Sequence, residues 1–100
     1  MKTYTASRTG GIPSVTVDGQ PLNPRLDLHN HSPDGFEWGY AGSGPAQLAL
    51  ALLANALEDH DQACRWCQDF KRAVVAELPR DGWSLTSEEI RAKVETLTAA

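Results

Sequence analysis

The sequence predicts an α+β fold: a small N-terminal antiparallel sheet packed on a buried Ala/Leu-rich helix, with two further helices. Short alternating segments between glycine and proline turns fill the first 41 residues. A nearly uncharged apolar segment follows at residues 46–57, and two amphipathic segments complete the chain. We expect 100 residues to form a single domain with a β-rich half (1–41) and a helical half (42–100).

The first third contains the expected strands. Residues 2–7 alternate in polarity and predict an edge strand, and residues 14–17 alternate again before the dipeptide Asp18-Gly19. This dipeptide favours a type I′ hairpin turn, which needs a positive φ at both central residues. Residues 20–22 are then the returning arm, and Pro21 confines that arm to an edge of the sheet.

Aromatic side chains alternate in the next segment. Residues 36–40 place Phe36, Trp38 and Tyr40 on one face of an expected short strand. Such aromatic rings are typical of a core, although a subset can form a binding surface. Stacking on nucleic acid is disfavoured, because the only charge in this segment is that of Glu37.

Two histidines and two cysteines have the chemistry of metal ligands. Residues 25–31 alternate, so a strand there would place His29 and His31 on its polar face. Cys64 and Cys67 lie inside an expected helix, and Cys67 belongs to the apolar stripe of that helix. We therefore predict no metal and no cofactor, and the sequence leaves open whether the four side chains approach each other.

Catalytic residue types occur without a catalytic pattern. Asp27, His29 and His31 could act with Ser32 or Ser43 as nucleophile. Triads are recognised by their geometry, and nothing in the spacing of these residues specifies one. We predict that the protein is not an enzyme.

The helix expected at residues 46–57 is apolar on nearly all sides, which is typical of a buried central helix. Pro45 fits its first position, with Gly44 or Ser43 as the cap. The segment is shorter than the roughly 20 residues that span a bilayer, so no membrane association is predicted. Its large apolar surface leaves a homodimer open.

Two amphipathic helices follow. Asp59 is expected to cap the first of them, whose inward stripe consists of Ala63, Cys67, Phe70, Val74 and Leu78. Residues 83–85 are interpreted as an extended link. Thr86 and Glu89 form a capping box that begins the last helix, with an inward stripe of Ile90, Val94 and Leu97.

The charge distribution restricts partners and location. The formal net charge is −4, which disfavours direct nucleic-acid binding. Residues 58–100 hold nine acidic and six basic side chains, so most of the negative charge lies on the C-terminal helices. Two closely spaced cysteines and an N-terminus without an apolar run favour a cytoplasmic location.

The turn Gly42-Ser43-Gly44-Pro45 has two interpretations. Loose backbone N–H groups at a helix N-terminus can bind phosphate or carboxylate groups, although Pro45 removes one donor. The same glycines also suit a tight connection that needs a close approach of the backbone. Both interpretations stay open at this point.

Residues 30–49 form a long motif that includes His-Ser-Pro-Asp-Gly-Phe-Glu-Trp-Gly-Tyr-Ala-Gly-Ser-Gly-Pro-Ala-Gln-Leu-Ala. In this motif the chain resembles a family of small bacterial and archaeal proteins of unknown function, and the similarity extends over most of the sequence. The resemblance implies no activity. It implies a context of plasmids, phages and integrated elements.

That context leads to a hypothesis about function. We expect a small protein-binding module, in the form of a stoichiometric inhibitor of a host defence nuclease or a CRISPR–Cas component. The alternative is a small-ligand or nucleotide-binding module at the glycine-rich turn. The candidate binding residues are His31, Ser32, Trp38, Tyr40, Gly42, Ser43 and Gly44.

Overall fold

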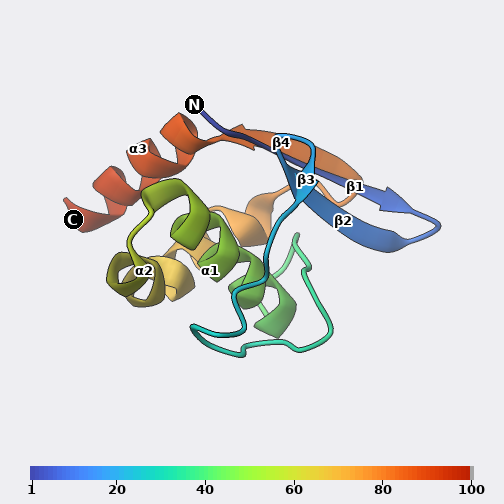
Figure 1. Cartoon of the computed structure of the whole chain (residues 1–100), viewed down its shortest axis with the longest axis horizontal. Helices are drawn as coiled ribbons and strands as arrows, with labels where there is room; N and C mark the ends of the chain where they lie inside the picture. Colours follow the sequence, from blue (N-terminus) through green and yellow to red (C-terminus); the bar gives the residue numbers. More distant parts are fainter. Residues whose placement is uncertain (100) are drawn as a thin grey trace.

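A four-stranded antiparallel sheet covers a layer of helices in the computed structural model, which describes residues 1–99 (Figure 1). The strands are β1 (Thr3–Thr9), β2 (Ile12–Val17), β3 (Gln20–Pro21) and β4 (Gly82–Thr86), in the order β3-β2-β1-β4. The helices are α1 (Ser43–Leu57), α2 (His60–Ala73), the short 3₁₀ helix η1 (Val75–Glu77) and α3 (Ser87–Thr98). The α+β prediction is confirmed.

The hairpin turn forms as its sequence predicts. Asp18 has a φ of 49° and Gly19 a φ of 86°, so both turn residues lie in the left-handed region that a type I′ turn requires. The returning arm is β3, which is two residues long and lies at the edge of the sheet, as Pro21 requires.

The predicted edge strand at residues 2–7 is wrong in one respect: β1 lies inside the sheet. It pairs with β2 through Tyr4 opposite Val17, and with β4 through Tyr4 opposite Leu85. Residues 83–85, interpreted as a link, belong to β4. The pairing joins segments about eighty residues apart, which local periodicity does not reveal.

Helix α1 forms the centre of the core. Twelve of its fifteen residues are buried, as its apolar sequence predicts. The helix begins two residues earlier than expected: Gly42, and not Ser43 or Gly44, is the N-cap, and Pro45 is the third helical residue instead of the first. Proline is tolerated there because the first turn has N–H groups without intrahelical partners. Within residues 1–99, no helix is long and apolar enough to cross a membrane.

The strands predicted at residues 25–31 and 36–40 are not formed. Both segments belong to an irregular connection from β3 to α1, which runs around the N-terminal part of α1 (Figure 1). Arg25 has a φ of 57° and accepts turn hydrogen bonds from the N–H groups of Leu28 and His29. Gly39 has a φ of 88° and its N–H donates to the carbonyl oxygen of Val75. A local turn at residues 25–29 and a distant partner for Gly39 therefore take the place of strand pairing.

The caps of α2 and α3 agree with the sequence. The Asp59 side chain accepts from the backbone N–H of Gln62, and Thr86 forms a complete capping box with Glu89. Helix α2 ends at Ala73, so the last residues of its predicted stripe lie beyond it. These residues, Val74 and Leu78, still pack on the core.

Candidate functional site

Trp38, a predicted binding residue, lies in the core. Its side chain is fully buried, and its indole N–H donates to the carbonyl oxygens of Pro79 and Arg80 at 2.9 and 3.0 Å. The ring meets Trp83 edge to face, with centroids 5.7 Å apart. Trp38 therefore joins the loop to β4 and presents no accessible surface. Tyr40, in contrast, is 48% exposed.

The glycine-rich turn is a place of close packing. A Cβ atom on Gly44 would lie 2.8 Å from the Cβ of Glu37, and one on Gly42 would lie 2.6 Å from the Tyr40 ring. Ser43, between them, is exposed. The first turn of α1 contains no acidic side chain, and its N-cap makes no side-chain hydrogen bond. Close approach to the Cβ and backbone of Glu37 accounts for Gly44, whereas the exposed Tyr40 ring beside Gly42 can move aside. Ligand binding at this turn stays a prediction.

Gln47 holds the loop that contains His31 and Ser32. Its Oε1 accepts from the backbone N–H of His31 at 2.7 Å and from that of Ser32 at 3.0 Å. Its Nε2 donates to the carbonyl oxygens of Pro24 and His29. Gln47 is absent from the predicted binding residues, although one of only two amide side chains in an otherwise apolar helix, the other being Asn55, was the available signal.

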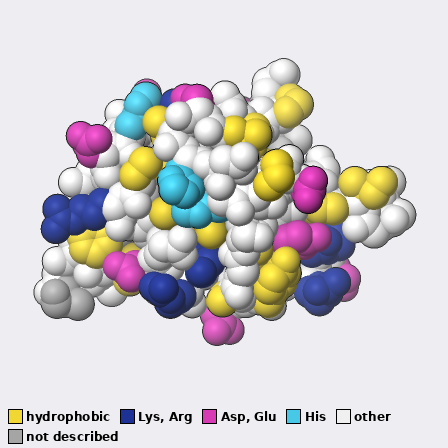
Figure 2. Space-filling model, turned by 90° about the horizontal axis from the view of Figure 1, so that it is seen from below, with side chains coloured by type: hydrophobic (Ala, Val, Ile, Leu, Met, Phe, Trp, Pro, Cys, Tyr) yellow, Lys and Arg dark blue, Asp and Glu magenta, His cyan; other side chains and the backbone are white. Residues whose placement is uncertain are grey.

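Histidine and cysteine side chains meet beside α2. A cavity of about 160 Å³ is lined by His29, His31, Cys64 and Cys67, together with Leu50 and Gln68. The imidazole rings of His29 and His31 have centroids 4.2 Å apart, and His31 Nε2 lies 3.8 Å from Cys67 Sγ. Figure 2 shows an adjacent pair of histidines at the surface, among hydrophobic side chains.

Burial shapes the protonation of this cluster. It lowers the pKa of His31, an effect that His29 and Lys71 reinforce, and it raises the pKa of the Cys67 thiol. Among residues 1–99, no group of three or more His, Cys, Asp or Glu side chains is arranged to hold a metal ion. These shifts leave a neutral imidazole beside a protonated thiol at neutral pH, with His31 Nε2 and Cys67 Sγ 3.8 Å apart.

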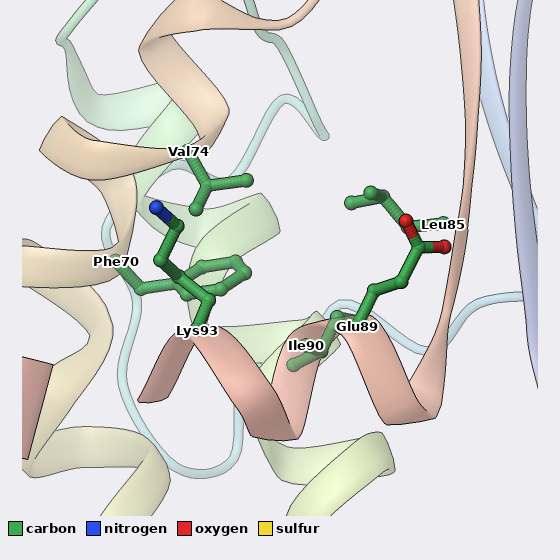
Figure 3. Close-up of a pocket in the computed structure, with 6 residues that line it drawn as sticks. All are labelled: Phe70, Val74, Leu85, Glu89, Ile90 and Lys93. Atoms are coloured by element: carbon green, nitrogen blue, oxygen red, sulfur yellow. The ribbon is translucent and has the colours of Figure 1, made fainter. Parts of the chain in front are cut away.

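A second cavity of about 170 Å³ lies between β4, α3 and the end of α2 (Figure 3). Its lining is mostly apolar and consists of Phe70, Val74, Leu85, Glu89, Ile90 and Lys93. Leu85 and Ile90 are the two residues that the sequence places around the α3 capping box. In Figure 3 the Glu89 side chain extends toward Leu85, and the Lys93 side chain extends toward Val74.

Backbone groups of β4 face outward next to this cavity. Residues of an antiparallel strand bond alternately to the two sides. The N–H of Ser87 donates to the carbonyl oxygen of Lys2 at 2.9 Å, on the β1 side. The same alternation directs Trp83 and Leu85 to β1 and turns the N–H and C=O of Ser84 to the outer edge. Since β4 is the last strand of the sheet in the described part of the chain, no strand pairs with that edge.

The comparisons with known proteins identify a family without an assigned activity. The model of a family of unknown function, DUF6166, matches residues 4–96. No curated protein and no solved structure matches the chain. The family match spans the sheet, all three α-helices and both cavities, up to the last turn of α3. The chain therefore belongs to the family of unknown function DUF6166.

Proposed function

We propose that the protein is a non-catalytic protein-binding module that takes up an extended segment of a partner along the outer edge of β4. The observation that supports the proposal is the free backbone edge at Ser84 directly beside an apolar cavity. Strand addition needs this combination, because main-chain hydrogen bonds provide affinity and a pocket for alternate side chains provides specificity.

The geometry defines the added strand. A partner residue opposite Ser84 exchanges hydrogen bonds with the N–H and C=O of Ser84. The two partner residues that flank it direct their side chains to the inner face of the sheet, where Leu85 lines the cavity. A cavity of about 150 Å³ holds a benzene ring, so the one here accommodates a single aromatic or branched apolar side chain.

The charged side chains at the mouth of the cavity indicate which residue type the partner should carry next to its apolar anchor. Glu89 Oε1 accepts a 3.0 Å hydrogen bond from the backbone N–H of Thr86. Lys93 is exposed, and none of the ion pairs within residues 1–99 involves it. An acidic residue next to the inserted apolar side chain would complement Lys93. The expected partner segment is thus extended, with an apolar anchor and an adjacent carboxylate.

Selection from a display library of random peptides tests this proposal. We expect the selected peptides to share an apolar residue with a neighbouring Asp or Glu. Ser84→Pro removes the outward N–H but no β1–β4 hydrogen bond, and Ser84→Ala is its matched control. Dissociation constants from fluorescence anisotropy should rise about 10-fold for Ser84→Pro, equivalent to about 1.4 kcal/mol, and should not change for Ser84→Ala.

A second variant tests the cavity separately. Val74→Phe fills the cavity from the end of α2 and leaves β4 intact, so it should also weaken peptide binding. Circular dichroism and thermal unfolding verify that each variant is folded. Peptides that bind wild type, Ser84→Pro and Val74→Phe with equal affinity would overturn the proposal.

A more specific proposal concerns the identity of the partner protein. The context of mobile elements suggested by the motif leads us to propose a host defence nuclease or CRISPR–Cas component as the target. The acidic excess of residues 58–100 supports contact with a positively charged channel. Purified effector nucleases should lose activity at a stoichiometric ratio of this protein, and Ser84→Pro should relieve the inhibition. Full nuclease activity in the presence of excess protein would exclude those effectors.

The alternative proposal is a small-ligand or phosphate site at Gly42, Ser43 and Gly44. Exposed Ser43 and the absence of acidic residues in the first turn of α1 support it. Thermal unfolding with inorganic phosphate and nucleoside phosphates tests it. A ligand-dependent rise in the melting temperature that Ser43→Ala reduces would favour it over strand addition, and an unchanged melting temperature would remove it.

A further inference from the structure

Cys64 and Cys67 are positioned on α2 so that they can be joined. Residues three apart in an α-helix have Cα atoms about 5 Å apart, inside the range of about 4.4–6.8 Å found in disulfides. Their Cβ atoms, about 5–6 Å apart in a regular helix, must approach to about 4 Å. A bridge would therefore tighten one helical turn, and the resulting strain raises its reduction potential, so the bridge forms when the low-molecular-weight disulfide is in excess.

The two thiols differ in accessibility. Cys64 is exposed, whereas Cys67 is only 3% exposed and lines the same cavity as Leu50. A disulfide in solution can reach Cys64 but not Cys67. The exposed thiol is thus the attacking group, and the buried thiol can react only with Cys64 Sγ after that sulfur has formed a mixed disulfide.

His31 provides a proton acceptor for the buried thiol. Its Nε2 lies 3.8 Å from Cys67 Sγ. The backbone N–H of His31 donates a 2.7 Å hydrogen bond to Gln47 Oε1, which fixes the position of this loop. Burial lowers the pKa of His31 and raises that of the Cys67 thiol, so at neutral pH the imidazole is neutral and the thiol keeps its proton. The imidazole can accept that proton only as Cys67 attacks. The cavity of about 160 Å³ between His31 and α2 has room for a departing thiol.

From this arrangement we propose that Cys64 and Cys67 form a dithiol site that reduces low-molecular-weight disulfides, with His31 as the base for Cys67. Cys64 loses its proton to solvent and attacks the disulfide R–S–S–R, forming a Cys64–S–S–R mixed disulfide and releasing one RSH. Cys67 then transfers its proton to His31 and attacks Cys64 Sγ. The disulfide bond between Cys64 Sγ and the outer sulfur breaks, the released thiolate RS⁻ takes up a proton, and the two cysteines are left joined as a disulfide, oxidised by two electrons.

Incubation of the reduced full chain with oxidised glutathione, followed by mass spectrometry, tests the site. The wild type should lose two free thiols, form one intramolecular disulfide and retain no glutathione. Cys67→Ala should keep one glutathione on residue 64, because no second thiol can displace it. Cys64→Ala should stay unmodified because Cys67 is buried. Circular dichroism and a second variant, Cys67→Ser, verify that the result does not reflect unfolding.

The base is tested by the lifetime of the mixed disulfide. His31→Ala should extend that lifetime about 10-fold or more, since a positioned base accelerates proton transfer. His60→Ala, which changes an exposed histidine of α2, is the matched control and should leave the lifetime unchanged. The proposal is overturned if wild-type protein retains glutathione, if Cys64→Ala reacts as fast as wild type, or if His31→Ala resolves at the wild-type rate.

Discussion

The side-chain oxygen of Gln47 accepts a 2.7 Å hydrogen bond from the backbone N–H of His31, inside the core. The same amide bonds to Ser32, Pro24 and His29, so one buried side chain satisfies four backbone groups of the loop. A segment without strands or helices thus acquires a defined position over the N-terminal part of α1. That position places His31 Nε2 3.8 Å from Cys67 Sγ.

Gln47→Leu should therefore destabilise the protein by about 2–4 kcal/mol, since each hydrogen bond contributes about 1 kcal/mol net. Urea unfolding measures the loss, and hydrogen exchange should show reduced protection at His31 and Ser32. Gln20→Leu, on the exposed strand β3, is the control and should change the free energy of unfolding little. A Gln47→Leu variant as stable as wild type would contradict the role of this amide.

Tyr4 should make the free energy of unfolding decrease as the pH rises into the alkaline range. Burial raises the pKa of its hydroxyl from 10.0 to about 12, and the hydroxyl donates to Asn55 Oδ1 at 2.7 Å. Because the folded-state pKa is the higher one, this stabilisation is complete below pH 10 and is lost as the pH rises toward 12. Unfolding at several pH values should show this loss for wild type and less of it for Tyr4→Phe. Tyr40→Phe, at an exposed ring, should behave as wild type does.

The ion pair of Arg8 and Glu37 should make the free energy of unfolding decrease as the pH falls into the acidic range. Arg8 donates two hydrogen bonds to the carboxylate, at 2.7 and 3.2 Å, and its guanidinium lies 4.4 Å from the Trp38 ring centroid. The hydrogen bonds from Arg8 lower the pKa of Glu37. The associated stability is present above the ordinary glutamate pKa of about 4.3 and is lost as the pH falls further.

Glu37→Gln should therefore reduce the dependence of the free energy of unfolding on pH below about 4.3. Urea unfolding across the acidic range measures it. Glu95→Gln, at an exposed position of α3, is the matched control and should preserve the wild-type profile. Identical acid profiles for wild type and Glu37→Gln would rule out this contribution.

Gly44→Ala tests the close packing of the glycine-rich turn. Its new methyl group would lie 2.8 Å from the Cβ of Glu37, an atom that cannot move without its backbone. We expect a loss of about 1–3 kcal/mol, the usual range for overpacking. Ser43→Ala, one residue earlier and exposed, should be nearly neutral in thermal unfolding. Equal stability of the two variants would contradict the packing interpretation.

Local signals predicted the elements whose partners are near in sequence. The hairpin turn at Asp18 and Gly19 depends on the φ angles of two neighbouring residues. The caps at Asp59 and Thr86 each bond to a residue three positions later. The aromatic alternation at residues 36–40 misled, because alternation does not show that a distant group, such as the Val75 carbonyl, replaces a neighbouring strand.

The sequence by itself determined the α+β class, the burial of α1, and the turns and caps, because composition and short-range spacing encode them. Tertiary structure alone decided that β4 joins β1, that the backbone of Ser84 faces outward, and that His31 meets Cys67. These relationships join residues that are 36 or more positions apart. They form only when the whole chain packs and its burial offsets the entropy of closing long loops.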